Sequence, residues 1–96
     1  MRRCFLVSYD VRDPKRLRKV HRLMKAYGEP WQFSVFYCVL RDIDRVRMEN
    51  DLRAEVDLRA DQVLIIDLGG RDEEVRETVT TLGPSLPEPE SGMVVI

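Results

Sequence analysis

The order of predicted elements is that of an α+β domain with a ferredoxin-like βαββαβ fold, in which an antiparallel sheet carries two helices on one face. Three observations predict it. Apolar runs rich in β-branched and aromatic residues alternate with amphipathic helical segments. Glycine and proline stand where elements would end. The length of 96 residues and the hydrophobic content of 44% suit a single domain over residues 1–96.

The first strand and the first helix are predicted over residues 4–9 and about 14–27. The strand is a continuous apolar run of β-favouring residues. Asp13 is a favourable helix N-cap, and Pro14 suits the first helical position because no backbone N–H is needed there. Gly28 then ends the helix. At about 100° per residue, one arc of this helix is apolar and is predicted to face the sheet: Leu17, Val20, Leu23, Met24 and Tyr27.

Residues 31–40 are longer than an average strand, so they form either one bent strand or two strands that break near Ser34. Phe36 and Tyr37 in this segment are interpreted as core or dimer contacts rather than base-stacking residues. A second helix is predicted over about residues 42–58, and a further strand over residues 62–68.

The end of the chain is predicted to contain a short helix and a separate apolar strand. Val75, Val79 and Leu82 indicate the helix, which ends before Gly83. Residues 83–92 are a proline-rich extended connector, and residues 93–96 are apolar and β-favouring. Because an apolar strand needs a sheet edge, we expect it to be exchanged with the partner's sheet in a homodimer.

The formal net charge of −1 conceals an uneven distribution. Residues 1–30 hold nine Lys and Arg against three Asp and Glu, and residues 15–25 hold six cations and no acidic residue. Ion pairs at i,i+4 therefore cannot neutralise the first helix. A solubilising surface is the simple interpretation, but phosphate better explains a cluster without counter-charges. The predicted nucleic-acid-binding residues are Arg16, Arg18, Lys19 and Arg22.

The first residues predict no targeting or membrane segment, because the apolar run after Arg3 is too short for either. We therefore expect a cytoplasmic protein with no membrane partner. Cys4 and Cys38 lie in apolar runs and are expected to be buried free thiols.

Asp10, at the end of the first strand, has two interpretations. Aspartate is a common turn former, so its carboxylate could simply cap the turn that leads to Asp13. Alternatively, a carboxylate at a strand end could meet its symmetry mate across a two-fold axis, which would supply a pair of oxygen ligands for a hard metal.

Three segments resemble the CRISPR-associated protein 2 family: residues 7–10 (VSYD), 15–20 (KRLRKV) and 32–36 (QFSVF). The resemblance continues through residues 61–66 (DQVLII) and, more loosely, to the end of the chain. It implies a homodimer that bridges dimers of the CRISPR integrase, CRISPR-associated protein 1, and contacts the backbone of DNA awaiting integration. It also implies that Asp10 is a catalytic and metal-binding residue for Mg²⁺ or Mn²⁺ shared between subunits. Tyr37 departs from the family, in which many relatives carry an acidic residue there.

The favoured function is thus a CRISPR adaptation protein that binds nucleic-acid backbone and scaffolds the integrase for spacer acquisition, with metal-dependent endoribonuclease or endodeoxyribonuclease activity as an associated expectation. One alternative is a stand-alone, toxin-like endoribonuclease. Another is a ferredoxin-like small-molecule regulatory module, which would need a ligand motif, and the chain has no Gly-rich phosphate loop. Phosphate binding does not distinguish RNA from single- or double-stranded DNA, so each of these nucleic acids stays open.

Overall fold

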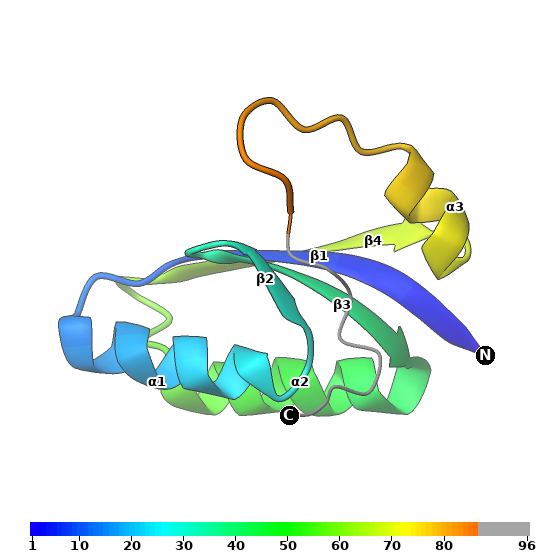
Figure 1. The fold of residues 1–96 in the computed structure, drawn as a ribbon. Helices are drawn as coiled ribbons and strands as arrows, with labels where there is room; N and C mark the ends of the chain where they lie inside the picture. Colours follow the sequence, from blue (N-terminus) through cyan, green and yellow to red (C-terminus); the bar gives the residue numbers. More distant parts are fainter. Residues whose placement is uncertain (87–96) are drawn as a thin grey trace.

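The computed structural model describes residues 1–86 and confirms the ferredoxin-like arrangement (Figure 1). The elements are β1 (Arg2–Asp10), α1 (Pro14–Lys25), β2 (Glu29–Gln32), β3 (Val35–Arg41), α2 (Asp42–Glu55), β4 (Gln62–Gly69) and α3 (Asp72–Glu77). The strands form one antiparallel sheet in the order β2-β3-β1-β4. Helices α1 and α2 cover one face of it, as predicted.

Strand β1 lies at the centre of the sheet, and its alternation divides the molecule into two faces. Phe5, Val7 and Tyr9 are buried in the main core beneath the sheet, together with side chains of α1 and α2. The intervening residues point to the opposite face, because successive side chains of a strand alternate. On that face Leu6 pairs with Tyr37 of β3 on one side and with Ile66 of β4 on the other. We call this second surface the open face.

Helix α1 begins as the sequence predicts. The Asp13 carboxylate accepts a hydrogen bond of 2.9 Å from the backbone N–H of Arg16, and Pro14 is the first helical residue. The helix ends at Lys25, two residues before the predicted end. Position 28 requires glycine because β3 approaches the backbone closely there. A Cβ would lie 2.5 Å from both the Cys38 Sγ and the Tyr37 carbonyl oxygen.

Residues 31–40 belong to two strands, which is the second of the two predicted arrangements. Strands β2 and β3 are separated by a turn at Phe33 and Ser34. The Ser34 carbonyl accepts a hydrogen bond of 3.1 Å from the Tyr9 backbone N–H, which ties the turn to the end of β1. Phe36 and Tyr37 are both buried, as interpreted from the sequence.

The predicted short helix near Val75 is confirmed as α3, but it ends at Glu77 rather than near Leu82, whose side chain is exposed. It packs on the open face, where Val75 contacts Cys4 and Tyr37, so a third helix lies opposite the other two. The predicted strand at residues 93–96, and its exchange in a homodimer, lie outside the described residues. No helix within residues 1–86 has the length and apolar character needed to cross a membrane.

Candidate functional site

Asp10 is the last residue of β1 and its side chain belongs to the open face. It pairs in register with Gln62 of β4, and 71% of its side chain is exposed. The Arg12 guanidinium lies 4.0 Å from the carboxylate, at the limit of an ion pair. Asp10 is therefore an accessible carboxylate, and the described contacts do not show it capping a turn.

The donor set around Asp10 does not by itself form a metal site. Mg²⁺ and Mn²⁺ bind through several oxygen ligands. Within residues 1–86, no group of three or more Asp, Glu, His or Cys side chains is placed to hold a metal ion. Within this part of the chain, the ion-pair partner of Asp10 is the cationic Arg12, not a second carboxylate. One copy of this part of the chain thus offers a single carboxylate at this position.

The outer surface of α1 is cationic, as the sequence predicts. Its exposed cations are Lys15, Arg18, Lys19, Arg22 and Lys25. None of them forms an ion pair with any residue of the described part of the chain. Like charges one turn apart, such as Arg18 and Arg22, repel each other. We call this surface the α1 cationic face.

Arg16 differs from the other predicted nucleic-acid-binding residues, because its guanidinium is already bound. Its Nε and Nη2 donate to the two carboxylate oxygens of Asp61, at 2.8 and 3.1 Å. The side chain of Asp61 is fully buried and also accepts from the backbone N–H groups of Arg12 and Asp57. These hydrogen bonds hold the pKa of Asp61 well below its ordinary value, and the bond from Arg16 has the largest effect. Arg16 therefore ties α1 to the loop before β4, and Arg18, Lys19 and Arg22 are the members of the predicted set without an ion pair among residues 1–86.

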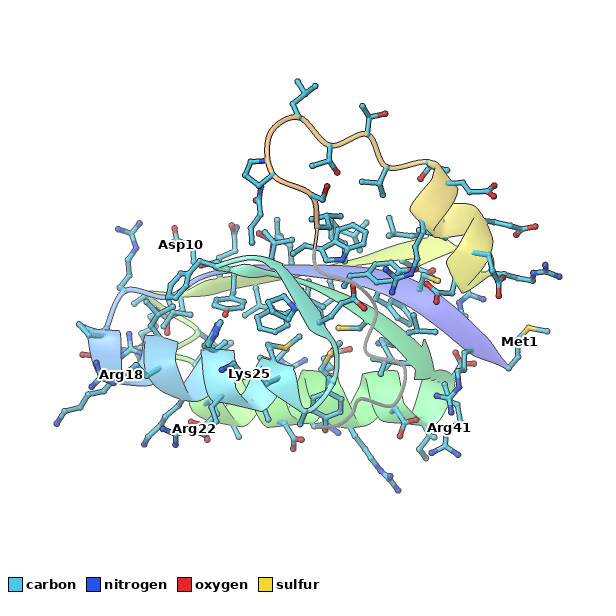
Figure 2. The ribbon with its side chains drawn as sticks, in the orientation of Figure 1. Met1, Asp10, Arg18, Arg22, Lys25 and Arg41 are labelled. Atoms are coloured by element: carbon cyan, nitrogen blue, oxygen red, sulfur yellow. The ribbon has the colours of Figure 1, made fainter. Side chains whose placement is uncertain are left out.

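The structure does not bring the two sets of predicted site residues together within one chain. Asp10 points to the open face, whereas the α1 cationic face points away from the sheet on the other side. Figure 2 shows Asp10 at the far side of the sheet from α1, and Arg18 and Arg22 extending outward below the helix. A nucleic acid bound along α1 would therefore not also lie on Asp10 of the same copy.

The open face carries apolar side chains on strand β4. Leu64, Ile66 and Leu68 are all exposed there. Strand β4 is also an edge of the sheet, because within residues 1–86 it pairs only with β1. An apolar patch beside an unpaired edge is a surface typical of protein association.

Around Cys4 and Tyr37 the open face is covered by α3, beneath which lies a polar network that sequence analysis did not anticipate. The Tyr37 hydroxyl donates its proton to the Asp72 carboxylate at 2.7 Å, and its oxygen is also hydrogen-bonded to the Cys4 thiol, with the Sγ at 3.2 Å. Arg76 lies over the Tyr37 ring at 4.8 Å and binds Asp72 and Glu29. Burial, followed by these two hydrogen bonds, raises the pKa of Tyr37 far above its ordinary value.

Tyr37 is thus a neutral structural residue that docks α3. It pairs in register with Leu6, four residues before Asp10, which separates it from Asp10 by about 13 Å along the strand direction, at about 3.3 Å per residue. The side chain at position 37 therefore acts on α3 and lies away from the Asp10 of the same copy.

A groove of about 730 Å³ lies between α2 and β4, with apolar residues such as Phe5, Leu52 and Ile65 in its lining. The charged groups at its margin are bound to one another: Arg3 to Asp67 and Arg45 to Glu49, each at 2.6 Å. It therefore offers a small-molecule ligand few uncommitted charges, and it does not favour the regulatory-module alternative.

Comparison with known proteins places the chain among close relatives. Residues 2–75 match the model of the family described as CRISPR associated protein Cas2. A curated relative from Rhodospirillum rubrum, CRISPR-associated endoribonuclease Cas2 1, is 39% identical over 92 residues, which cover 96% of this chain and 89% of the relative. CRISPR-associated endoribonuclease Cas2 of Geobacter sulfurreducens is 37% identical over 83 residues, 86% of each chain.

The fold has a matching solved structure. The crystal structure of Streptococcus pyogenes Cas2 at pH 6.5 superposes with a TM-score of 0.74 and 34% identity, covering 83% of this chain and 99% of that one. The family match begins in β1 and ends within α3, so it includes the whole sheet and both helices beneath it.

Proposed function

This chain belongs to the CRISPR-associated protein Cas2 family, and from that membership we propose that it is a CRISPR adaptation protein that binds nucleic-acid backbone and scaffolds the spacer integrase complex. Its proposed partners are a second copy of itself and the integrase, CRISPR-associated protein 1. The observation that carries the proposal is the α1 cationic face, whose exposed cations have no partner within residues 1–86.

The cationic face supports binding to backbone rather than to particular bases. Phosphate contacts by Arg and Lys position a protein on nucleic acid without reading its sequence. Their binding energy comes largely from the release of counterions, and each contact neutralises one phosphate. The exposed cations of α1, which have no ion pair in the described part of the chain, can supply such contacts, and a bound phosphate would also reduce the repulsion between them.

The proposal is tested by replacing Arg18, Lys19 and Arg22 together with Gln. Loss of three phosphate contacts should reduce the slope of log K against log salt concentration by about 2 to 3 units, at about 0.7 to 0.9 per contact. Fluorescence anisotropy with a labelled oligonucleotide across a salt series measures the slope.

The matched control changes three exposed cations elsewhere, Arg47, Arg53 and Arg59, to Gln, which removes the same total charge. This control should leave the slope nearly unchanged. Equal loss in both variants, or no loss in the α1 variant, would show that α1 is not the binding surface.

We also propose that two copies associate through their open faces. The exposed Leu64, Ile66 and Leu68 beside the β4 edge support this arrangement. Ile66→Glu should shift sedimentation toward the monomer, because a charge there would be buried at the contact. Ile43→Glu, at an exposed apolar position on α2, is the control and should not shift it. Deleting residues 93–96 should also favour the monomer if that strand is exchanged.

A second function, metal-dependent phosphodiester cleavage, is favoured by the exposed Asp10 on the open face and by the endoribonuclease names of the relatives. One carboxylate is too few for a metal site, so we propose a Mg²⁺ or Mn²⁺ site shared between two copies, each contributing its Asp10. A bound metal would supply Lewis-acid activation of water and phosphate. The protein's own residues would contribute the two carboxylates, and the apolar patch would hold the copies together.

Asp10→Asn separates the two functions, because it keeps the size of the side chain and removes its charge. Cleavage by the wild type should require Mg²⁺ or Mn²⁺ and should fall by at least about 100-fold in the variant. Spacer acquisition should persist, since backbone positioning depends on the α1 cations. Cleavage that Asp10→Asn leaves intact would remove Asp10 from the nuclease proposal. Acquisition lost together with cleavage would contradict the scaffold as an independent function.

A further inference from the structure

Phe33 is the one aromatic side chain within residues 1–86 that is exposed, with 65% of it accessible. It stands in the turn between β2 and β3. An exposed aromatic ring loses the free energy that burial would supply. A binding function at the surface would account for the exposure of Phe33.

The Phe33 ring is held in place from below. It stacks on the His21 ring, with centroids 5.2 Å apart and an interplanar angle of 20°. His21 in turn packs edge-on against the buried Phe36 ring. The buried Tyr9 hydroxyl donates to the Phe33 carbonyl oxygen at 3.2 Å and lies 3.0 Å from the His21 Nδ1. Both the backbone and the ring of Phe33 are thus fixed, so binding on its outer side would cost little ordering entropy.

The α1 cationic face begins directly beside this ring pair. His21 is itself a residue of α1, and Lys25 and Arg18 lie about 40° and 60° from it around the helix, one turn to either side. Arg22 lies further from His21 around the helix, in the same direction as Lys25 and Arg18. Cations along a groove or helix next to an exposed aromatic ring are the combination that single-stranded nucleic-acid sites use.

We propose that Phe33 stacks against one unpaired base of a nucleic acid whose phosphates bind the α1 cationic face. This inference rests on the proposed nucleic-acid binding and makes it more specific. One ring face of Phe33 lies on His21, so a single face is left for a base. A base inside a duplex is stacked on both sides by its neighbours, so only an unpaired or terminal base can occupy that face. The protein should therefore prefer strands with unpaired bases near α1.

The test compares wild type, Phe33→Leu and Phe33→Trp in anisotropy titrations at one salt concentration. Leu keeps an apolar side chain without a π-face, and Trp keeps the π-face. Three probes are used: a single-stranded oligonucleotide, a duplex of the same sequence whose ends are closed by non-nucleotide linkers so that it holds no unpaired or terminal base, and a single strand of abasic sugar-phosphate. Phe33→Leu should weaken binding of the single strand by about 5-fold or more, and Phe33→Trp should retain it. Binding of the abasic strand should change less than about 2-fold in every variant.

A spectroscopic measurement distinguishes stacking from a structural role. The tryptophan of Phe33→Trp should be quenched by the single strand and not by the abasic strand, after subtraction of the wild-type signal from Trp31. Loss of affinity for all three probes in Phe33→Leu would mean that the ring only supports the turn, and would overturn the inference. Unchanged affinity in Phe33→Leu would overturn it as well.

The two proposals fail in different ways. If the Arg18, Lys19 and Arg22 replacement abolishes binding and Phe33→Leu does not alter it, the backbone-binding function stands and the stacking site is wrong. If neither variant alters binding of any probe, the nucleic acid binds elsewhere and both proposals are wrong.

Discussion

Removing the Tyr37 hydroxyl tests whether the network beneath α3 holds the helix on the sheet. In Tyr37→Phe the ring keeps its stack on Trp31, at 4.4 Å, and its contact with Arg76. The change deletes the 2.7 Å hydrogen bond to Asp72, a bond to a charged group worth about 1.5 to 3 kcal/mol. Arg76 still binds Asp72 at 2.7 Å, so the carboxylate keeps a partner and the lower part of that range applies.

A loss of about 1.5 to 2 kcal/mol corresponds to a decrease in Tm of roughly 6 to 16 °C for a domain of this size. Circular dichroism melts at fixed protein concentration measure it, because association would also shift Tm. In Tyr37→Phe, hydrogen exchange of the α3 amides should become faster than in the wild type, and it should change more than that of the α1 amides. The control is Tyr27→Phe, which deletes an exposed hydroxyl bond of 2.6 Å to Asp51 and should cost about 0.5 kcal/mol or less. Equal losses in the two variants would refute the assignment of Tyr37 as the residue that docks α3.

Two further predictions concern positions that hold the fold. The pKa of Asp61 is lowered in the folded state, mainly by Arg16, so its contribution to stability is complete above the ordinary carboxyl pKa of about 4 and is lost as pH falls below that value. Asp61→Asn should thus be less stable than wild type at neutral pH and should lose less stability on acidification in urea titrations; parallel pH profiles would contradict this. Gly28→Ala should destabilise by about 1 to 3 kcal/mol, because its Cβ would lie 2.5 Å from the Tyr37 carbonyl oxygen, and an unchanged urea midpoint would contradict that close approach.

The sequence predicts those features of the fold that depend on residues close together along the chain. Asp13 and Pro14 place the start of α1 correctly because capping involves residues within one turn. The alternation of β1 likewise determines that Asp10 lies on the face opposite Tyr9. The sequence does not decide whether β2 and β3 are separate strands, because no Gly or Pro marks a break within residues 31–40 and the turn is held by a contact with the distant Tyr9 of β1.

The sequence does not predict contacts between residues that are far apart along the chain. Helical periodicity placed Arg16 among the α1 cations, but its partner Asp61 follows 45 residues later. Tyr37 and Asp72 are 35 residues apart, so the docking of α3 on the open face left no local pattern. The exposure of Phe33 was equally hidden, since an aromatic residue in a β-favouring segment is usually buried.

The parallel stack of Trp31 on Tyr37 gives the protein a built-in optical reporter. Trp31 is the only tryptophan of the chain, and its ring lies at 8° to that of Tyr37 with centroids 4.4 Å apart. Its Nε1 also donates to Glu29, which binds Arg76 of α3. Any event that lifts α3 from the sheet must change the surroundings of this indole. Intrinsic fluorescence of the unlabelled wild type can thus follow α3 during association with a partner, without a dye or an introduced residue.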